Sequence, residues 1–466
     1  MITTLTPDQE FVISSAVHWF HHSPEQLFQY DGPPGSGKSV VLNEIVRRLG
    51  LRLEDEVAPM SFIGAASLVM RTKGLYTART AHSWLFDLYK EDLRSGAGTG
   101  EVLKTHSGKR VSKWGFVPKT ALSPTIKLII VDEAYCMPRS LRPIIESFGI
   151  KILACGDSNQ LPPVNDIPAF LVDGKIYHLT QIMRQTGKDD IIFLANQAAM
   201  GYPLMNGYYG NSLVIDRQDL TDDMLLWADV IICGTNKTRD ILNNHIRSIR
   251  GFHSVIPRFG ERIVCRNNNW QIRARDANGI EINLVNGLIG SVVNCPSISN
   301  YDTKVKGLNI QFQCDTANVV FDCIADGLYF IGDSAYRAGY KSGVISPYYR
   351  AQLFEFAYAI TCHISQGSQF PKVIYIEERV NPSIQRCLNL VGITRATDQL
   401  IYVNDNNRPW REYPEDFDPT PYFDKYKDKL NYFNQLYSQA KQKIDREKYK
   451  DQRVSFNKFK RRRHSK

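Results

Sequence analysis

A glycine-rich stretch near the start of the chain, GPPGSGKS at residues 32–39, combines residue types that bind phosphate. Glycines let consecutive backbone N–H groups curve around an anion, because no Cβ atom obstructs the approach. Lys38 can reach the outer phosphates of a nucleotide, and Ser39 can ligate Mg²⁺. The pattern therefore predicts a phosphate-binding loop. We expect the nucleotide to contact Gly32, Pro33, Pro34, Gly35, Ser36, Gly37, Lys38 and Ser39.

The segments around this loop agree with that interpretation. Residues 26–31, QLFQYD, read as a short strand, and residues 40–49, VVLNEIVRRL, have apolar residues at helical spacing. A helix that begins directly after the loop points its N-terminus, with its unpaired N–H groups, at the phosphates. The strand–loop–helix context disfavours the alternative of a chance glycine-rich turn.

Two carboxylates follow a second apolar run, in IKLIIVDEAY at residues 126–135. A continuous apolar run indicates a strand buried on both faces, as in a parallel sheet. Ligands bind at the carboxyl ends of such strands. Asp132 is therefore expected to hold Mg²⁺ together with Ser39, and Glu133 to polarise the attacking water. The alternative, a strand that simply ends in acids, loses weight with a phosphate loop upstream.

A third apolar run ends in a polar cluster, in IKILACGDSNQLPPV at residues 150–164. Gln160 lies beyond the tip of this predicted strand, where an amide can contact the γ-phosphate and report its loss. The three strand tips together predict a site that hydrolyses a nucleoside triphosphate.

The composition is that of an ordinary globular chain of 466 residues, with 43% apolar and 23% charged residues. It contains no run of about 18 apolar residues that could span a membrane, and its first residues lack the pattern of a signal peptide. Nine cysteines occur without a C-x-x-C pair, which argues against a zinc site or a disulfide framework. We therefore expect a cytoplasmic location, which is the host cytoplasm if a phage encodes the chain.

The net charge of +9 is concentrated at the end of the chain. Residues 421–466 contain 15 Lys and Arg but only 5 Asp and Glu, so the rest of the chain is close to neutral. The tail combines a stripe of aromatic and aliphatic residues at helical spacing with the basic end KFKRRRHSK. Docking on the body, salt-sensitive binding to nucleic acid and plain solvation all remain open for it.

The order of these blocks resembles that of superfamily 1 helicases, and GDSNQLPPV resembles their RecD/Dda branch in particular. The resemblance covers residues 4–404, and in size and spacing it is nearest to the phage Dda helicases. It implies an α/β fold with two RecA-like parallel-sheet motor domains. It also implies a β-hairpin insertion, or pin, in the first motor domain and a small β-rich, SH3-like insertion in the second.

Further blocks carry residues that the resemblance assigns to ATP. LTPDQ at residues 5–9 implies that Gln9 reads the adenine, and LTQIMRQ at 179–185 supplies Arg184 for the γ-phosphate. LVGITRATDQL at 390–400 supplies a second arginine, Arg395, and the late block ITCHISQGSQF adds Gly367. Both arginines are expected to face the nucleotide across a cleft. The catalytic residues implied in this way are Lys38, Asp132, Glu133, Gln160, Arg184 and Arg395.

The resemblance also suggests which residues contact a single DNA strand. It points to TAH at residues 80–82, to ICGTNKTRDILNNHIR at 232–247 and to the late block at 360–370. Trp84 is added because aromatic rings stack on bases, although it could equally pack in a core. The candidates are Thr80, His82, Trp84, Asn236, Lys237, Thr361 and His363.

Two blocks depart from the family pattern. The early DNA-contact block usually contains a Pro-Thr pair, whereas residues 61–74 read SFIGAASLVMRTKG. In the late block Ile364 stands where a lysine is common, which removes one possible contact with the DNA backbone.

Two interruptions of the motor pattern predict the insertions. The segment EVLKTHSGKRVSKWGF at residues 101–116 is typical of a hairpin with a turn at 107–108, in which His106, Trp114 and Phe116 could split a duplex. A surface hairpin without this role is the alternative. The predicted divisions are 1–85 with 119–185 for motor domain 1A, 86–118 for the pin, 186–290 with 351–408 for motor domain 2A, 291–350 for the β-rich insertion, and 409–466 for the tail.

The function implied is ATP-driven translocation on single-stranded DNA, 5′ to 3′, with unwinding of duplexes in replication, repair or recombination. ATP and Mg²⁺ are the implied cofactors. The implied partners are single-stranded and forked duplex DNA, with a single-strand-binding or replisome protein as a further candidate, no membrane, and a monomeric chain. A helicase on RNA or RNA–DNA hybrids, and an ATP-switched clamp that does not unwind, are the alternatives.

Overall fold

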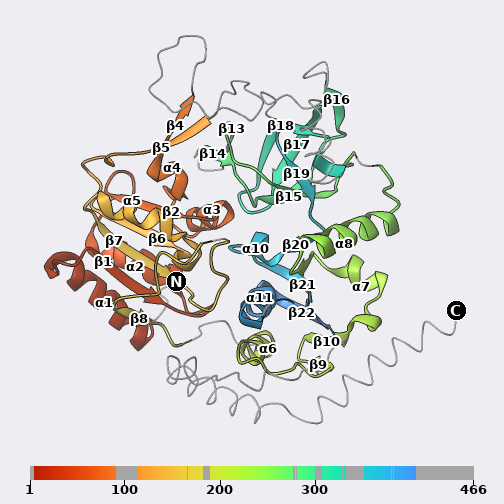
Figure 1. Cartoon of the computed structure of the whole chain (residues 1–466), viewed down its shortest axis with the longest axis horizontal. Helices are drawn as coiled ribbons and strands as arrows, with labels where there is room; N and C mark the ends of the chain where they lie inside the picture. The colour runs from red at the N-terminus through yellow and green to blue at the C-terminus, as the bar shows by residue number, and fades with distance from the viewer. Residues whose placement is uncertain are drawn as a thin grey trace, which may run out of the picture.

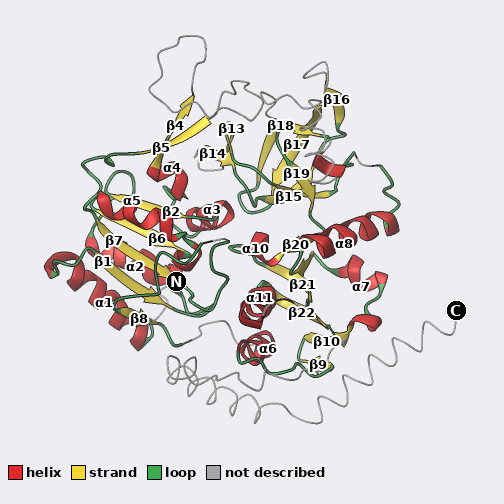
Figure 2. Ribbon diagram, in the orientation of Figure 1, coloured by secondary structure: helices red, strands yellow, loops and turns green. Residues whose placement is uncertain are grey.

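The structure is a computed structural model. It describes residues 5–90, 114–181 except 165, 189–331 with gaps at 255, 277–278, 280, 300–306 and 328, and 351–405 except 379 and 381. Two sheets with flanking helices lie side by side, and a third, β-rich unit lies above the second of them (Figure 1). Figure 2 shows how helices surround the strands of the first two sheets. In the described part of the chain, no helix combines the length and the apolarity needed to cross a membrane.

The first sheet, called lobe one here with its helices, is parallel throughout and has the strand order β3-β2-β6-β7-β1-β8. Successive residues of β6 belong to two separate apolar clusters, because Leu128 and Ile130 pack on one face and Ile129 and Val131 on the other. This is the two-sided burial that the apolar run predicted. The strands are β1 (Leu27–Asp31), β2 (Val57–Ser61), β3 (Arg79–Thr80), β6 (Leu128–Asp132), β7 (Lys151–Gly156) and β8 (Ile176–His178).

The helices of lobe one connect these strands. The long ones begin at clear signals: Thr6 caps the first and accepts a hydrogen bond from the backbone N–H of Gln9, and Gly37 precedes the second. The helices are α1 (Pro7–His22), α2 (Lys38–Leu49), α3 (Gly64–Thr72), α4 (Ala81–Leu85) and α5 (Arg142–Ser147), with the 3₁₀ turns η1 (Ala134–Cys136) and η2 (Arg139–Leu141).

The second sheet, lobe two, has the order β20-β11-β21-β22-β10-β9 and is parallel except for the edge pair β9–β10. Its strands are β9 (Gly207–Tyr209), β10 (Ser212–Asp216), β11 (Val230–Cys233), β20 (Ala359–Thr361), β21 (Phe370–Ile376) and β22 (Ala396–Asn404). Its helices are α6 (Asp189–Ala199), α7 (Asp222–Trp227), α8 (Asn236–Ile249), α10 (Cys362–Ser365) and α11 (Pro382–Thr394), with η3 (Arg217–Asp219). The two parallel sheets confirm the predicted α/β fold class.

The β-rich unit is an antiparallel sheet with the order β16-β17-β15-β12-β19, and β18 pairs with β17. Its strands are β12 (Arg262–Cys265), β15 (Ile289–Val292), β16 (Ser297–Ser299), β17 (Gly307–Cys314), β18 (Val319–Asp326) and β19 (Phe354–Phe356). The turn η4 (Tyr329–Ile331) and a hairpin of β13 (Asn269–Arg275) with β14 (Glu281–Leu284) accompany it.

Both predicted ends of the β-rich insertion are wrong. Residues 262–265 and 354–356 were assigned to the second motor domain, but both strands pair within the antiparallel sheet. The insertion therefore begins before 291 and ends after 350. The physical reason is that Ile263 and Cys265 of β12 are buried in the apolar core of the insertion, whereas Val264 between them packs in the apolar cluster of lobe two. A likeness of this sheet to SH3 domains stays a prediction.

The predicted pin region begins and ends with a paired stem. Strand β4 (Phe86–Lys90) runs antiparallel to β5 (Trp114–Pro118), with Leu88 opposite Phe116 and Lys90 opposite Trp114. The predicted turn and His106 lie outside the described residues, as do Arg184 and the tail from residue 406. A role for this hairpin in splitting duplexes stays a prediction.

Candidate nucleotide site and nucleic-acid contacts

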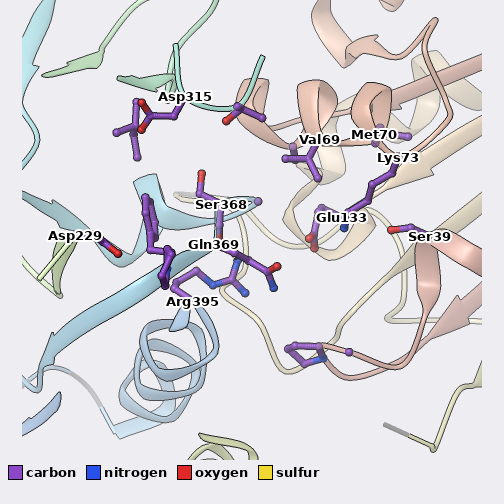
Figure 3. A pocket seen from close by; sticks show the side chains of 18 of the residues that line it. Ser39, Val69, Met70, Lys73, Glu133, Asp229, Asp315, Ser368, Gln369 and Arg395 are labelled. Carbon is purple, nitrogen blue, oxygen red and sulfur yellow. Dashed lines mark hydrogen bonds between the residues drawn. The ribbon is translucent and has the colours of Figure 1, made fainter. Parts of the chain in front are cut away.

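A cleft of about 1400 Å³ opens between the two lobes. Figure 3 shows Ser39 and Glu133 from lobe one and Arg395 from lobe two pointing into the same space. The strand tips of lobe one and a loop and a helix end of lobe two therefore meet there. The predicted site residues that line the cleft are Pro34, Gly35, Gly37, Lys38, Ser39, Asp132, Glu133, Gln160, Gly367 and Arg395.

The phosphate loop has the backbone geometry that its glycines permit. Gly35 and Gly37 have φ angles of 87° and 82°, in the left-handed region that other residues rarely adopt. Gly37 precedes α2 and offers no side chain to cap it, so the first N–H groups of the helix stay available for an anion. A Cβ atom on Gly37 would lie 2.5 Å from Nε2 of Gln9, so a larger residue would displace this side chain and would also strain the backbone.

Lys38 lies over this loop. Its Nζ donates to the carbonyl oxygens of Gly32 at 2.8 Å and Pro33 at 3.2 Å, which holds the ammonium group beside the loop. The hydroxyl of Tyr30 donates to the carbonyl of Lys38 and fixes the start of the helix. Ser36 is buried, and its hydroxyl has no hydrogen-bond partner among the described residues.

Gln9 lies behind the loop rather than on the wall of the cleft. Its Oε1 accepts from the backbone N–H of Thr6 at 3.0 Å, and its Nε2 donates to the carbonyl of Ser36 at 2.9 Å. Both ends of the amide therefore support α1 and the loop. The adenine contact of Gln9 stays a prediction.

Asp132 and Glu133 lie at the tip of β6. Asp132 Oδ1 accepts from the backbone N–H of Glu133 at 2.9 Å and from the Cys155 thiol at 3.2 Å, which fixes its carboxylate. Glu133 has a φ of 50°, a strained backbone conformation of the kind that occurs at functional sites. Burial and the neighbouring Asp132 raise the pKa of Glu133, while Lys38 and Arg395 oppose that rise.

The oxygen groups in the cleft fit Mg²⁺. Ser39 and Asp132 both line it and provide a hydroxyl and a carboxylate, the hard oxygen donors that this ion prefers. In the described ranges, no three His, Cys, Asp or Glu residues gather to form a metal cage. Mg²⁺ in nucleotide sites usually takes one or two carboxylates together with phosphate oxygens, so such a cage is not needed.

Gln160 reaches the cleft from the loop after β7. Its side chain is only 3% exposed, and its Oε1 has no hydrogen-bond partner in the described part of the chain. The backbone N–H of Gln160 donates to the carbonyl of Asp157 at 3.1 Å, which holds the loop in a turn. A buried polar atom that faces a cleft without a partner suits a ligand contact.

Arg395 reaches the cleft from the end of α11. Its guanidinium donates to the carbonyls of Val391 at 3.1 Å and Ser368 at 3.2 Å, and to the hydroxyl of Thr394. No ion pair of Arg395 is present among the described residues. Burial lowers the pKa of Arg395, and Glu133 counteracts this. The arginine is therefore a buried cation that is held by neutral groups and lines the cleft.

The lobe-one candidates for DNA contact lie outside this cleft. Thr80 caps α4 by accepting from the backbone N–H of Ser83. The ring of His82 lies 5.5 Å from that of Phe86 in a stacked arrangement, and burial lowers the pKa of His82. Trp84 donates its indole N–H to the carbonyl of Pro59 at 2.8 Å, which anchors it to lobe one.

The lobe-two candidates occupy two helix starts. Asn236 and Lys237 are exposed at the beginning of α8, and Asn236 accepts from Arg239 at 3.0 Å. In α10, Thr361 is buried at the cap and His363 is exposed. Their role in DNA binding stays a prediction, as does that of the lobe-one candidates.

Other residues of this region did not stand out in the sequence. The cleft wall includes Arg250 and Tyr358 of lobe two and Arg262 of the β-rich unit. Glu378 lies at the start of α8, where it accepts hydrogen bonds from the backbone N–H groups of Gly234 and Thr235. No local motif marks these residues, because only the tertiary structure brings them to these places.

Family comparisons agree with the two lobes. Residues 4–206 match the AAA domain, and residues 356–403 match the UvrD-like helicase C-terminal domain. The ATP-dependent DNA helicase PIF1 of Saccharomyces cerevisiae is 26% identical over 218 residues, which are 42% of this chain and 23% of that protein. The chain thus spans about a quarter of the length of this curated relative.

Solved structures extend the likeness to nearly the whole chain. The crystal structure of Pif1 helicase from Candida albicans matches with a TM-score of 0.50 and 16% identity, over 92% of this chain and 100% of that one. The chain has the fold of the Pif1 helicases. A Pif1 structure that addresses unwinding of forked double-stranded DNA by two coordinating Pif1 helicases also has a TM-score of 0.50, with 16% identity over 91% of this chain and 98% of that one.

Proposed function

We propose that this chain is an ATP-dependent DNA helicase that moves along single-stranded DNA and unwinds duplexes. The observation that carries the proposal is the meeting of the phosphate loop, Asp132, Glu133 and Gln160 of lobe one with Arg395 of lobe two in one cleft. The fold and both family matches agree with it, and the relatives named above are described as helicases.

ATP hydrolysis needs positioned charges more than covalent chemistry. Lys38 and Arg395 neutralise the negative charge that develops on the transferred phosphoryl group, and Arg184 is proposed as a further contact. Ser39 and Asp132 would hold Mg²⁺, which would neutralise part of the negative charge of the phosphates. Glu133 orients and polarises the attacking water, and Gln160 contacts the γ-phosphate.

Closure of the cleft would follow from this arrangement. A nucleotide held by lobe one and completed by Arg395 draws the lobes together, and loss of the γ-phosphate releases them. Movement along DNA needs each lobe to grip the strand differently in the two states. We propose Thr80, His82 and Trp84 for the grip of lobe one, and Asn236, Lys237, Thr361 and His363 for that of lobe two.

The finer assignments rest on the sequence blocks. They are 5′-to-3′ movement, a monomeric state, a site of action in the cytoplasm, a role in replication, repair or recombination, and a special closeness to phage Dda helicases. The hairpin of β4 and β5, with His106, Trp114 and Phe116, is the proposed pin. Forked DNA is the proposed substrate, and a single-strand-binding or replisome protein a proposed partner.

A strand-displacement assay with two forks tests the proposal. One fork carries only a 5′ single-stranded tail and the other only a 3′ tail, and Lys38→Ala serves as the inactive control. We expect ATP-dependent displacement from the 5′-tailed fork, little from the 3′-tailed fork, and none with Lys38→Ala.

The other outcomes each reject one part. Displacement from the 3′-tailed fork alone would reject the polarity. ATP hydrolysis stimulated by single-stranded DNA, with displacement from neither fork, would replace unwinding by the clamp function. Stimulation by single-stranded RNA but not by DNA would reject the DNA substrate.

A further inference from the structure

A contact between the lobes lies directly beside the nucleotide cleft. Leu161, the residue after Gln160, is only 1% exposed. It belongs to an apolar cluster whose other buried members, among the residues described, come from lobe two, apart from Val264 and Ile289 of the β-rich unit. Lobe one thus inserts a leucine into the core of lobe two, one residue away from the predicted γ-phosphate contact.

Cys136 links the same place through hydrogen bonds. Its thiol donates to the carbonyl of Leu161 at 3.3 Å and accepts from Nε2 of Gln366 in lobe two, also at 3.3 Å. Burial raises the pKa of the Cys136 thiol far above its usual range, so the thiol keeps the proton that it donates. The backbone N–H of Cys136 donates to the carbonyl of Glu133, which ties the thiol to the predicted water-activating residue.

The partner segment in lobe two is α10 with the residues that follow it. Ile364 is 9% exposed and belongs to the same apolar cluster as Leu161. Gln366 is 5% exposed, and Gly367 packs so closely that a Cβ atom there would lie 3.0 Å from the backbone of Ala66. The exposed His363 is carried by the same helix.

We propose that Leu161, Cys136 and Gln366 form a coupling junction that transmits the state of the nucleotide site to α10 and its DNA-facing residues. This inference rests on the proposed function. Gln160 and Leu161 are consecutive, so a shift of Gln160 towards or away from a γ-phosphate moves the leucine in the core of lobe two. Leu161 and Cys136 are positioning residues, since they act through Gln160, Glu133 and α10.

The test replaces the leucine and measures coupling separately from ATP hydrolysis and from DNA binding. For Leu161→Ala we expect ATP hydrolysis without DNA, and affinity for single-stranded DNA by fluorescence anisotropy, to stay within about twofold of the unmodified protein. Stimulation of hydrolysis by single-stranded DNA is expected to fall about tenfold, within the range typical of coupling between sites. Strand displacement is expected to fall in parallel.

Matched variants exclude a general loss of core packing. Leu194 is a fully buried leucine of the same cluster that lies within lobe two, in α6. Leu194→Ala removes the same atoms from a residue that is not part of the junction, so stimulation should remain, although the free energy of unfolding falls. Leu161→Met nearly conserves the volume and should restore stimulation.

If Leu161→Ala does not fold, Cys136→Ala provides the second test, because it removes both hydrogen bonds of the thiol. We expect it to lower stimulation about threefold, at unchanged hydrolysis without DNA, since a neutral hydrogen bond contributes about 0.5–1.5 kcal/mol.

The outcomes separate the junction from the proposed function. Full stimulation in Leu161→Ala, or an equal loss in Leu194→Ala, would overturn the junction and leave the helicase proposal intact. An unmodified protein that hydrolyses no ATP, or that binds no single-stranded DNA, would overturn the helicase proposal itself.

Discussion

The two lobes contain the same unit, a parallel strand followed by a loop and a helix. They differ in whether side chains of the protein occupy the start of that helix. In lobe one, β1 leads into α2, whose preceding Gly37 provides no side-chain cap. In lobe two, β11 leads into α8, and there Thr235 caps the helix. The Glu378 carboxylate accepts the backbone N–H groups of Gly234 at 2.5 Å and Thr235 at 2.8 Å, together with the Thr235 hydroxyl at 2.9 Å.

A helix N-terminus attracts an anion, because its first N–H groups are unpaired and carry partial positive charge. In lobe two, Thr235 caps the helix by accepting from the backbone N–H of Thr238, and a carboxylate of the same chain, Glu378, already occupies the place just before the helix. In lobe one, neither a side-chain cap nor a carboxylate occupies the start of α2 among the described residues, so we propose that a phosphate binds there. Two lobes of the same construction can therefore differ in function. In the proposed function, lobe one binds the nucleotide and lobe two contributes Arg395.

The largest effect is expected at the start of α2 in lobe one, which has no side-chain cap. Lys38→Ala should lower ATP hydrolysis at least about 10⁴-fold, because it removes charge from both nucleotide binding and the transition state. Affinity for single-stranded DNA should survive. Hydrolysis is measured by phosphate release. A normal rate in this variant would show that the phosphate loop of lobe one is not the nucleotide site.

The contribution of lobe two is tested at Arg395. Arg395→Ala should lower kcat about 10³-fold, as expected for an arginine that stabilises transferred phosphoryl charge, with little change in nucleotide affinity. Arg395→Lys should recover only part of the loss, because an ammonium group lacks the planar fork. An unchanged kcat with alanine would confine the chemistry to lobe one.

A substitution of Glu133 tests which residue of lobe one polarises the attacking water. Glu133→Gln should lower kcat about 10²-fold through loss of the water-polarising carboxylate, while nucleotide affinity is retained. Steady-state kinetics separates the two quantities. A loss confined to affinity would show that Glu133 does not act on the reacting water.

The same substitution has a consequence for stability. The raised pKa of Glu133 favours its neutral form in the folded state. The stability that this brings is fully present below the ordinary pKa of about 4.5 and is lost as pH rises through the raised value. Glu133→Gln should therefore melt at a higher temperature than the unmodified protein at pH 7 and at nearly the same temperature at pH 4. A lower melting temperature at pH 7 would contradict the sign.

The smallest effect on ATP hydrolysis is expected at the start of α8 in lobe two, where Glu378 accepts hydrogen bonds. Glu378→Ala should lower the free energy of unfolding by about 1–3 kcal/mol, because it leaves several donors without an acceptor. ATP hydrolysis without DNA should change less than about twofold, and affinity for single-stranded DNA should fall modestly as Asn236 and Lys237 lose their support.

Asp222→Ala is the matched control for Glu378→Ala. Asp222 pairs with His245 on the surface, and both side chains are about half exposed. Surface pairs contribute little, so stability should change by less than about 1 kcal/mol. Equal destabilisation by both substitutions would show that the Glu378 carboxylate has no special role.

The sequence predicted those parts of the cleft that depend on neighbours along the chain. The phosphate loop and Asp132 with Glu133 follow strands whose apolar runs are visible by themselves, and Gln160 comes from the same kind of strand tip. Arg395 was located only through its resemblance to a family block, because nothing near it in the sequence indicates a phosphate.

The remaining features depend on residues that lie far apart in the chain. Glu378 meets Thr235 across 143 positions, and Gln366 meets Cys136 across 230. The predicted ends of the insertion were wrong for the same reason, because β12 pairs with β19, about 90 residues later. Short-range patterns contain no information about such pairings.

The central claim is that a γ-phosphate draws the two lobes together, and a distance between them tests it most directly. Ser14 on α1 and Ser248 on α8 are exposed and suit labelling as cysteines once Cys295, the exposed cysteine of the described part, is replaced by serine. A non-hydrolysable ATP analogue with Mg²⁺ should change the energy transfer between the labels, ADP should not, and Arg395→Ala should abolish the response. Equal transfer with the analogue and with ADP in the unmodified protein would contradict the account.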